Sequence, residues 1–381
     1  MRNLIFGFKG FLVAISLALI FLTVYLFGWE LLEAPFQGNE LAFVITMAEW
    51  VDKYLFQGVQ WYTFHVGGVS VTQTTQTGVY YAISFLHRLT GLTIPQATRL
   101  VSFLLVFLVS LEIYFLVWWR FKSQTMALLS ALFFPLSQAA WVEISYLGVL
   151  ALPFSVLFIL PTIFLFDFYL RERKTKIFVL TVFSFAGCFL AHILVAELVV
   201  GILLIWALLS SLFLSTQNKW ETLKFSFFAW IKVLVLGSLL ISFWLFPFFH
   251  YVGVVSRNLI PFKTIGQVNY ITLPFLLGFG DVWGGESDLA VFFALPILVF
   301  ALLGIVLAIV KKDKRVLLLS FFAVVFLVYP GLPFFAPRFV EIFFMNLVGE
   351  SYERAFVTPL VILPILAAYG VFQAGKLVFF W

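Results

Sequence analysis

Three charged side chains interrupt long apolar stretches of the chain. They are Glu112, Glu197 and Lys232. Ionisable residues inside apolar spans are candidates for a functional role by default, because burying a charge in hydrocarbon is costly. Glu112 and Lys232 lie at matched depth from the inner ends of their stretches. We therefore expect them to form a buried ion pair.

His192 lies within an apolar run from Lys176 to Leu214 that contains no hydrophilic loop. The run is too long for one helix, so it predicts a tight helical hairpin that turns near His192, at a membrane face. The histidine is either a satisfied interfacial residue or a ligand or proton carrier. Glu197 follows five residues later, roughly 140° around a helix, so the two do not form a metal pair. No zinc site is predicted.

Other chemical motifs are missing from the sequence. The single cysteine, Cys188, lies in an apolar run and excludes a disulfide framework or a thiolate metal cluster. The chain has no HExxH, no GxxxxGK[ST] and no basic run interleaved with aromatic residues. Protease, nucleotidase and nucleic-acid-binding functions are therefore not supported.

The composition indicates where the chemistry must take place. Of 381 residues, 63% are apolar and 11% are charged. A soluble domain needs roughly a quarter of its residues charged, so the composition excludes a water-soluble globule. The chain is predicted to be an all-α, polytopic membrane protein, with many of its 51 Phe and 12 Trp residues facing lipid or the membrane interfaces.

Charged or Pro/Gly-rich breaks divide the apolar sequence into ten stretches that could each cross a bilayer. They are expected near 4–29, 96–119, 125–143, 145–169, 176–191, 193–215, 225–248, 288–310, 315–333 and 356–380. The first reads as a retained signal-anchor helix. Residues 1–381 are expected to form a single integral-membrane domain.

The distribution of charge predicts the sidedness of these helices. If the N-terminus is cytoplasmic, 15 of the 23 Lys and Arg residues fall in cytoplasmic segments, against four carboxylates. The outer segments then hold seven cations and twelve carboxylates. This asymmetry follows the positive-inside rule and predicts a multi-pass protein of the cytoplasmic (plasma) membrane with both termini in the cytoplasm.

Three external segments are long, whereas every cytoplasmic connection is short. They span 30–95, 249–287 and 334–355. Long loops on one face usually carry binding and chemistry, so the working face is expected to be external. Within the first segment, apolar residues recur at helical spacing from Asn39 to Phe56, which predicts an interfacial amphipathic helix.

The order of these features resembles the GT-C superfamily of integral-membrane glycosyltransferases. The similarity is greatest to the branch labelled 6-pyruvoyl-tetrahydropterin-synthase-related membrane proteins. The matching stretches cover most of the chain in order: Gly38-Asn39-Glu40, Gly58-Val59-Gln60-Trp61, Gly78-Val79-Tyr80-Tyr81, Ala191-His192-Ile193-Leu194, Glu353-Arg354 and Ala368-Tyr369-Gly370. The resemblance implies a GT-C-like helix bundle and a polyprenyl-phosphate sugar donor bound at the outer leaflet.

Members of that superfamily use a carboxylate on the first external loop as base or metal ligand, and the resemblance assigns this role to Glu40. His192 is the candidate beside it. The chain departs from the family at two positions, because the family usually has Asp here and often His where this chain has Val44. A misplaced base can slow a reaction by about a hundredfold. Loss of activity is therefore an open alternative.

A lipid-phosphate donor also requires cations at the outer leaflet. Arg354 is the first candidate and Arg338 the second, followed by Arg257 and Lys263; the alternative for such residues is a snorkelling interfacial side chain. The expected contacts with acceptor or sugar are Trp61, His65, Tyr80 and Tyr81.

The sequence therefore favours a GT-C-like glycosyltransferase that acts externally on a polyprenyl-phosphate-linked sugar, with membrane lipids and this donor as its partners. The alternative is an inactive scaffold that serves as a structural or lipid-binding subunit of a membrane complex. A transporter ranks third, because no internal repeat is evident. The family's carboxylate leaves a divalent cation, Mg²⁺ or Mn²⁺, open as a cofactor.

Overall fold

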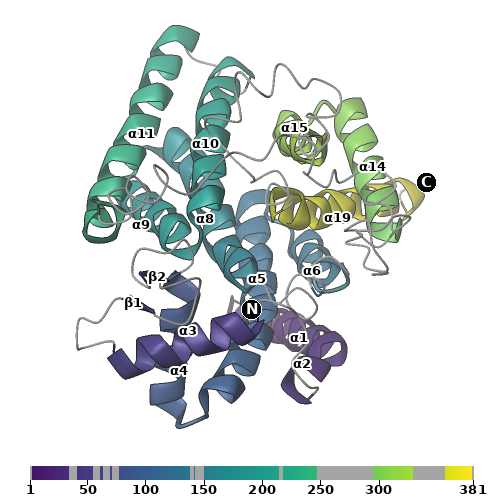
Figure 1. Cartoon of the computed structure of the whole chain (residues 1–381). Helices are drawn as coiled ribbons and strands as arrows, with labels where there is room; N and C mark the ends of the chain where they lie inside the picture. The colour runs from purple at the N-terminus through teal and green to yellow at the C-terminus, as the bar shows by residue number, and fades with distance from the viewer. Residues whose placement is uncertain are drawn as a thin grey trace.

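The structure is a computed structural model in which residues 2–33, 41–54, 61–62, 69–70, 77–137, 141, 150–213, 218–246, 295–328 and 357–379 are described. Within these residues the protein is a helix bundle with one pair of two-residue strands (Figure 1). In chain order the elements are α1 (Arg2–Gly28), α2 (Glu30–Glu33), α3 (Leu41–Tyr54), β1 (Trp61–Tyr62), β2 (Val69–Ser70), α4 (Thr77–Thr90), α5 (Ile94–Phe121), α6 (Gln124–Phe133), α8 (Ala151–Glu172), α9 (Thr175–Ala191), α10 (Ile193–Phe213), α11 (Lys219–Leu240), α14 (Leu295–Val310), α15 (Lys314–Val328) and α19 (Val357–Phe379).

Each of the ten apolar stretches expected from the sequence overlaps one of these helices. Six helices of the described chain contain segments long and apolar enough to cross a membrane: Gly10–Gly28, Ile94–Phe121, Pro153–Glu172, Val195–Leu212, Lys219–Leu240 and Leu360–Val378. The helices α6, α9 and α14 are apolar but shorter. The protein is thus a multi-pass membrane protein, and the number of ten spans stays a prediction.

Turns of two or three residues connect three pairs of consecutive helices at one end of the bundle. In each turn a basic residue adopts the left-handed backbone conformation, at φ 56° for Lys122, 54° for Arg173 and 52° for Lys312. Polar side chains cap two of the helices that follow: Ser123 Oγ accepts the backbone N–H of Met126 at 3.3 Å, and Asp313 Oδ1 accepts that of Arg315 at 3.2 Å. Cations at helix C-termini are favourable because they offset the helix dipole.

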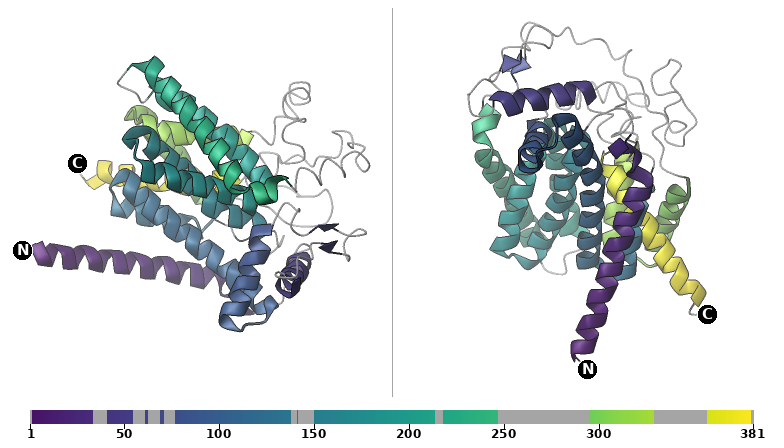
Figure 2. Two further views of the ribbon diagram at one scale, coloured as in Figure 1. Left: turned by 90° about the vertical axis from the view of Figure 1, so that its left-hand side faces the viewer. Right: turned by 90° about the horizontal axis from the view of Figure 1, so that it is seen from below.

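These turns place a large share of the chain's cations at what we call the basic end of the bundle. Described residues that lie there include Arg120, Lys122, Arg171, Arg173, Lys174, Lys176, Lys219, Lys311, Lys312, Lys314, Arg315 and Lys376. The N-terminus of α1 and the C-terminus of α19 also lie on this side (Figure 2). The structure therefore groups the charges as the sidedness count expects; which compartment the basic end faces stays a prediction.

The opposite end of the bundle carries α3 and α4, and we call it the α3–α4 end. Here α3 lies across the ends of the long helices instead of running along them (Figure 2). Its buried residues, Leu41, Val44, Met47, Ala48 and Val51, share one helix face. This confirms the amphipathic helix expected between 39 and 56.

Glycines permit close packing between α14 and α19. A Cβ atom on Gly304 would lie 2.1 Å from the carbonyl oxygen of Leu366, and one on Gly370 would lie 2.3 Å from that of Phe300. The two backbones are therefore in contact, with no room for a side chain between them.

Candidate functional site

The first turns of α3 and α4 meet at the α3–α4 end. The rings of Phe43 and Tyr80 pack edge to face with their centroids 6.4 Å apart. Leu41 and Val44 are buried beside them, 6% and 1% exposed. The helix α3 begins at Leu41. Glu40 is the residue before it in the chain and lies outside the described residues.

The first turn of α4 also rests against the last turn of α9. A Cβ atom on Gly78 would lie 2.7 Å from the carbonyl oxygen of Leu190 and 2.9 Å from the ring of Phe154. Only glycine allows so close an approach of two backbones. The first turn of α4 and the last turn of α9, more than a hundred residues apart in the chain, are thus in contact two residues before His192.

His192 forms the turn between α9 and α10, as expected from the uninterrupted apolar run. It is the only residue between the two helices, and its backbone is extended at φ −163° and ψ 113°. Its backbone N–H donates to the carbonyl oxygen of Cys188 at 2.8 Å. The side chain is fully buried, so the histidine lies inside the protein and not at an exposed interface.

A polar cluster holds the other end of α3 on α4. The carboxylate oxygen Oδ1 of Asp52 accepts hydrogen bonds from Arg88 Nε at 2.6 Å and from Ser84 Oγ at 2.9 Å. His87 Nε2 lies 3.7 Å from Asp52 Oδ2. Burial alone would raise the pKa of Asp52, but the hydrogen bonds from Arg88 and Ser84 and the charges of Arg88 and His87 outweigh it and lower the pKa. The cluster fixes where the first turn of α3 lies.

The remaining sequence-predicted contacts are only partly visible. Trp61 lies on β1, where it pairs with Ser70 of β2. Tyr80 is 1% exposed, whereas Tyr81 is 36% exposed and can reach a ligand. Partial burial raises the pKa of Tyr81, so its hydroxyl stays protonated as a hydrogen-bond donor.

Several candidates lie outside the described residues: Glu40, His65, Arg257, Lys263, Arg338 and Arg354. The segments 249–287 and 334–355, which the sequence predicts to be external, also lie outside them. Within the described part of the chain, no three His, Cys, Asp or Glu side chains gather as a metal site would require.

The expected ion pair between Glu112 and Lys232 is wrong. Lys232 lies on the exposed face of α11, whereas Oε1 of Glu112 is buried without a hydrogen-bond partner. Matched depth in two helices does not bring side chains together when the helices turn them to different faces. Glu197, the third charge of this set, is half-buried on α10.

A second polar site at the basic end was not expected from the sequence. Asp167 is 2% exposed, and its carboxylate contacts Arg120, Arg171 and Trp206. The sequence counts Asp167 as a cytoplasmic loop charge, but it lies inside α8. The available signal was its position between Phe166 and Phe168, since a carboxylate flanked by apolar residues usually has a buried partner.

No family model matches the chain. No curated protein matches it either. The resemblance to GT-C glycosyltransferases therefore remains an expectation based on short stretches, and the function is proposed below from the arrangement of those stretches.

Proposed function

We propose that this protein is a GT-C-like membrane glycosyltransferase that acts at the α3–α4 end of the bundle. One observation carries the proposal: two of the stretches that resemble the superfamily adjoin one another there, and a third immediately precedes α3 in the chain. The residue after Glu40 begins α3, the first turn of α3 packs on Tyr80, and Gly78 packs against the turn that holds His192.

The arrangement suits a phosphate-linked donor. The first turns of two helices meet at this end, and the free N–H groups of helix N-termini favour anions. The exposed hydroxyl of Tyr81 is a hydrogen-bond donor for sugar or acceptor. The proposed external cations Arg354, Arg338, Arg257 and Lys263 would pair with the phosphate.

In this proposal Glu40 acts as the general base. Its carboxylate accepts the proton of an acceptor hydroxyl, the acceptor oxygen bonds to the anomeric carbon, and the bond from that carbon to the carrier phosphate breaks. The products are the glycosylated acceptor and the free polyprenyl phosphate. The role of the buried His192 is to position neighbouring groups at the turn.

The first prediction concerns this base. Glu40→Gln keeps the shape of the side chain but cannot accept the proton, so sugar transfer should fall by about a hundredfold or more. The measurement is transfer of a radiolabelled sugar from dolichyl- or undecaprenyl-phosphate carriers by protein in vesicles. Glu49→Gln is the matched control, because Glu49 is exposed on α3 and should tolerate the same change.

Unchanged turnover in Glu40→Gln would remove Glu40 from the mechanism. Absence of transfer by the wild type with every carrier would favour the alternative, a non-catalytic scaffold in a membrane complex. One observation supports that alternative: Val44, at the position where the family often has His, is 1% exposed and faces the core.

A further inference from the structure

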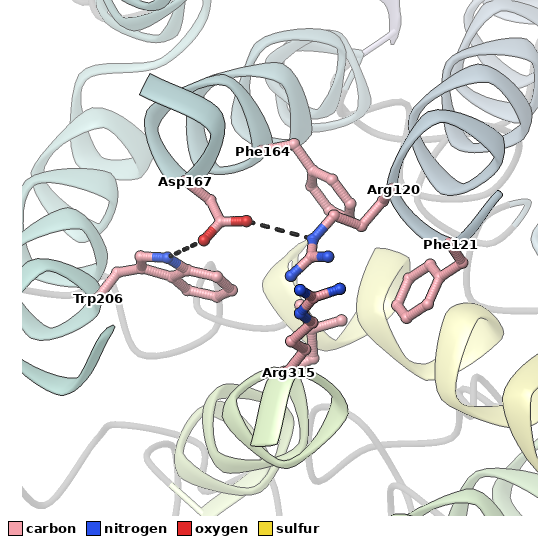
Figure 3. Close-up of a pocket in the computed structure, with 7 residues that line it drawn as sticks. Arg120, Phe121, Phe164, Asp167, Trp206 and Arg315 are labelled. Atoms are coloured by element: carbon pink, nitrogen blue, oxygen red, sulfur yellow. Dashed lines mark hydrogen bonds and ion pairs between the residues drawn. The ribbon is translucent and has the colours of Figure 1, made fainter. Parts of the chain in front are cut away.

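A small pocket opens at the basic end, on the opposite side of the bundle from the proposed catalytic site. Four helices form it (Figure 3), and its lining residues are Arg120, Phe121, Phe164, Asp167, Trp206, Arg315 and Leu319. The enclosed space has room for about one water molecule. Nothing in the proposed transferase reaction uses these residues.

Both carboxylate oxygens of Asp167 are already engaged. Oδ1 accepts the indole N–H of Trp206 at 3.2 Å. Oδ2 lies 3.2 Å from Arg120 Nε and also accepts from Arg171. Asp167 therefore neutralises the charge of one of two adjacent arginines.

Arg315 is a third arginine at this pocket. Figure 3 shows the terminal nitrogens of Arg120 turned toward the guanidinium of Arg315, away from Asp167. Arg120 is 8% exposed, whereas Arg315 is exposed at the mouth of the pocket. Two like charges that face each other, one of them nearly buried, repel unless an anion lies between them.

The charge of Asp313 also acts on Arg120, but this carboxylate is engaged elsewhere. Asp313 caps the start of α15, where its Oδ1 accepts the backbone N–H groups of Arg315 at 3.2 Å and Val316 at 3.4 Å. Its Oδ2 accepts the hydroxyl of Tyr369 at 3.4 Å. With both carboxylates included, Arg120, Arg171 and Arg315 still leave an excess of one positive charge.

We propose that Arg120 and Arg315 together bind a phosphate group at the mouth of this pocket. Guanidinium groups suit phosphate because they offer paired N–H donors in a fixed plane. Basic pockets between helices at a membrane surface are typical sites for anionic lipid headgroups. The enclosed space is too small for phosphate, so the anion lies across the mouth, where Arg315 is accessible. The phosphate comes either from a lipid headgroup or from free phosphate.

The test uses the full-length protein in detergent and measures bound anion by native mass spectrometry. In one arm the protein is incubated with phosphatidylglycerol in a phosphatidylcholine background. In the other arm it receives inorganic phosphate alone. Retention of phosphatidylglycerol only identifies a lipid site, whereas retention of inorganic phosphate identifies a site for the free anion.

Arg315→Gln is the decisive variant, because Arg315 makes no described ion pair and its removal leaves the Asp167 contacts intact. Binding should weaken about tenfold or more, as expected for loss of a charge-assisted hydrogen bond. Arg315→Lys should show an intermediate loss. Lys176→Gln is the matched control, since Lys176 is an exposed cation of the same end outside the pocket.

The proposal is overturned if the wild type retains neither anion, or if Arg315→Gln and Lys176→Gln weaken binding equally. The second outcome would indicate general attraction to a basic surface. Neither outcome depends on sugar transfer, so this test and that of the proposed function can fail separately.

Discussion

At the scale of single residues, Asp52 determines how α3 is held. Its carboxylate accepts from Arg88 and Ser84 at the end of α3, while the first turn of the same helix adjoins the proposed catalytic site. Loss of these hydrogen bonds would shift α3 and, with it, the residues that α3 positions at its other end. These hydrogen bonds also depend on pH, because they require the carboxylate of Asp52 to be ionised.

A pH dependence follows from this contact. The pKa of Asp52 is lower in the folded protein than its ordinary value of 3.8. The stabilisation is therefore fully present above that value and is lost as the pH falls through the lowered pKa. The protection factors of α3 amides, which are hydrogen-exchange rates corrected for the pH dependence of intrinsic exchange, should fall below about pH 4 in the wild type.

Asp52→Asn should show lower protection factors in α3 already at neutral pH, with little further change on acidification. Glu49→Gln, on the exposed face of the same helix, should behave as the wild type does. Equal protection factors of α3 at pH 7 and pH 3 in the wild type would contradict the role of Asp52.

At the scale of helices, sequence patterns predicted where helices lie along the chain better than they predicted which helix faces pack together. The uninterrupted run around His192 gave the hairpin correctly, and the amphipathic pattern gave α3. The start of α11 was expected near 225, but the helix begins at Lys219 because Asn218 accepts the backbone N–H of Trp220 at 3.1 Å. The wrong ion pair between Glu112 and Lys232 shows the limit of such patterns. A residue's depth along a helix does not tell which way the helix turns its side chain.

The contact between α14 and α19 leads to a prediction at this scale. Gly370→Ala would place a methyl group against the carbonyl oxygen of Phe300, so the helices must separate, at a cost of about 1–3 kcal/mol. Gly375→Ala is the control on the same helix, because nothing lies within 4 Å of its added Cβ. Denaturant titration of the protein in mixed micelles measures both.

Gly375→Ala should be neutral or slightly stabilising, because alanine favours helix more than glycine does. If both variants unfold at the same denaturant concentration as the wild type, the backbones of α14 and α19 do not touch as closely as described.

At the scale of the whole molecule, the bundle separates two kinds of site. The α3–α4 end carries stretches that the sequence linked to catalysis. The basic end holds a pocket lined by charged residues that the sequence used only to predict topology. Arg120, Asp167 and Arg315 were each assigned to the same side of the membrane, and the structure places all three at the basic end. Their meeting could not be predicted, because it depends on how α5, α8 and α15 pack.

Thiol labelling tests the orientation of the two ends. Cys188 is fully buried and should be silent, so single cysteines can be introduced by substitution. Thr90→Cys lies at the end of α4 and Lys174→Cys lies in the turn between α8 and α9, both exposed. If the basic end is cytoplasmic, an impermeant maleimide should label Thr90→Cys in intact cells and Lys174→Cys only after permeabilisation. The reverse pattern would invert the topology.

The short turns at Lys122, Arg173 and Lys312 also bear on how the protein enters a bilayer. So short a connection leaves no slack, so neither helix of a pair can move far from its neighbour. We therefore expect α5 with α6, α8 with α9, and α14 with α15 to enter the bilayer as pairs. If the basic end is cytoplasmic, the charged turn of each pair stays on the side of synthesis.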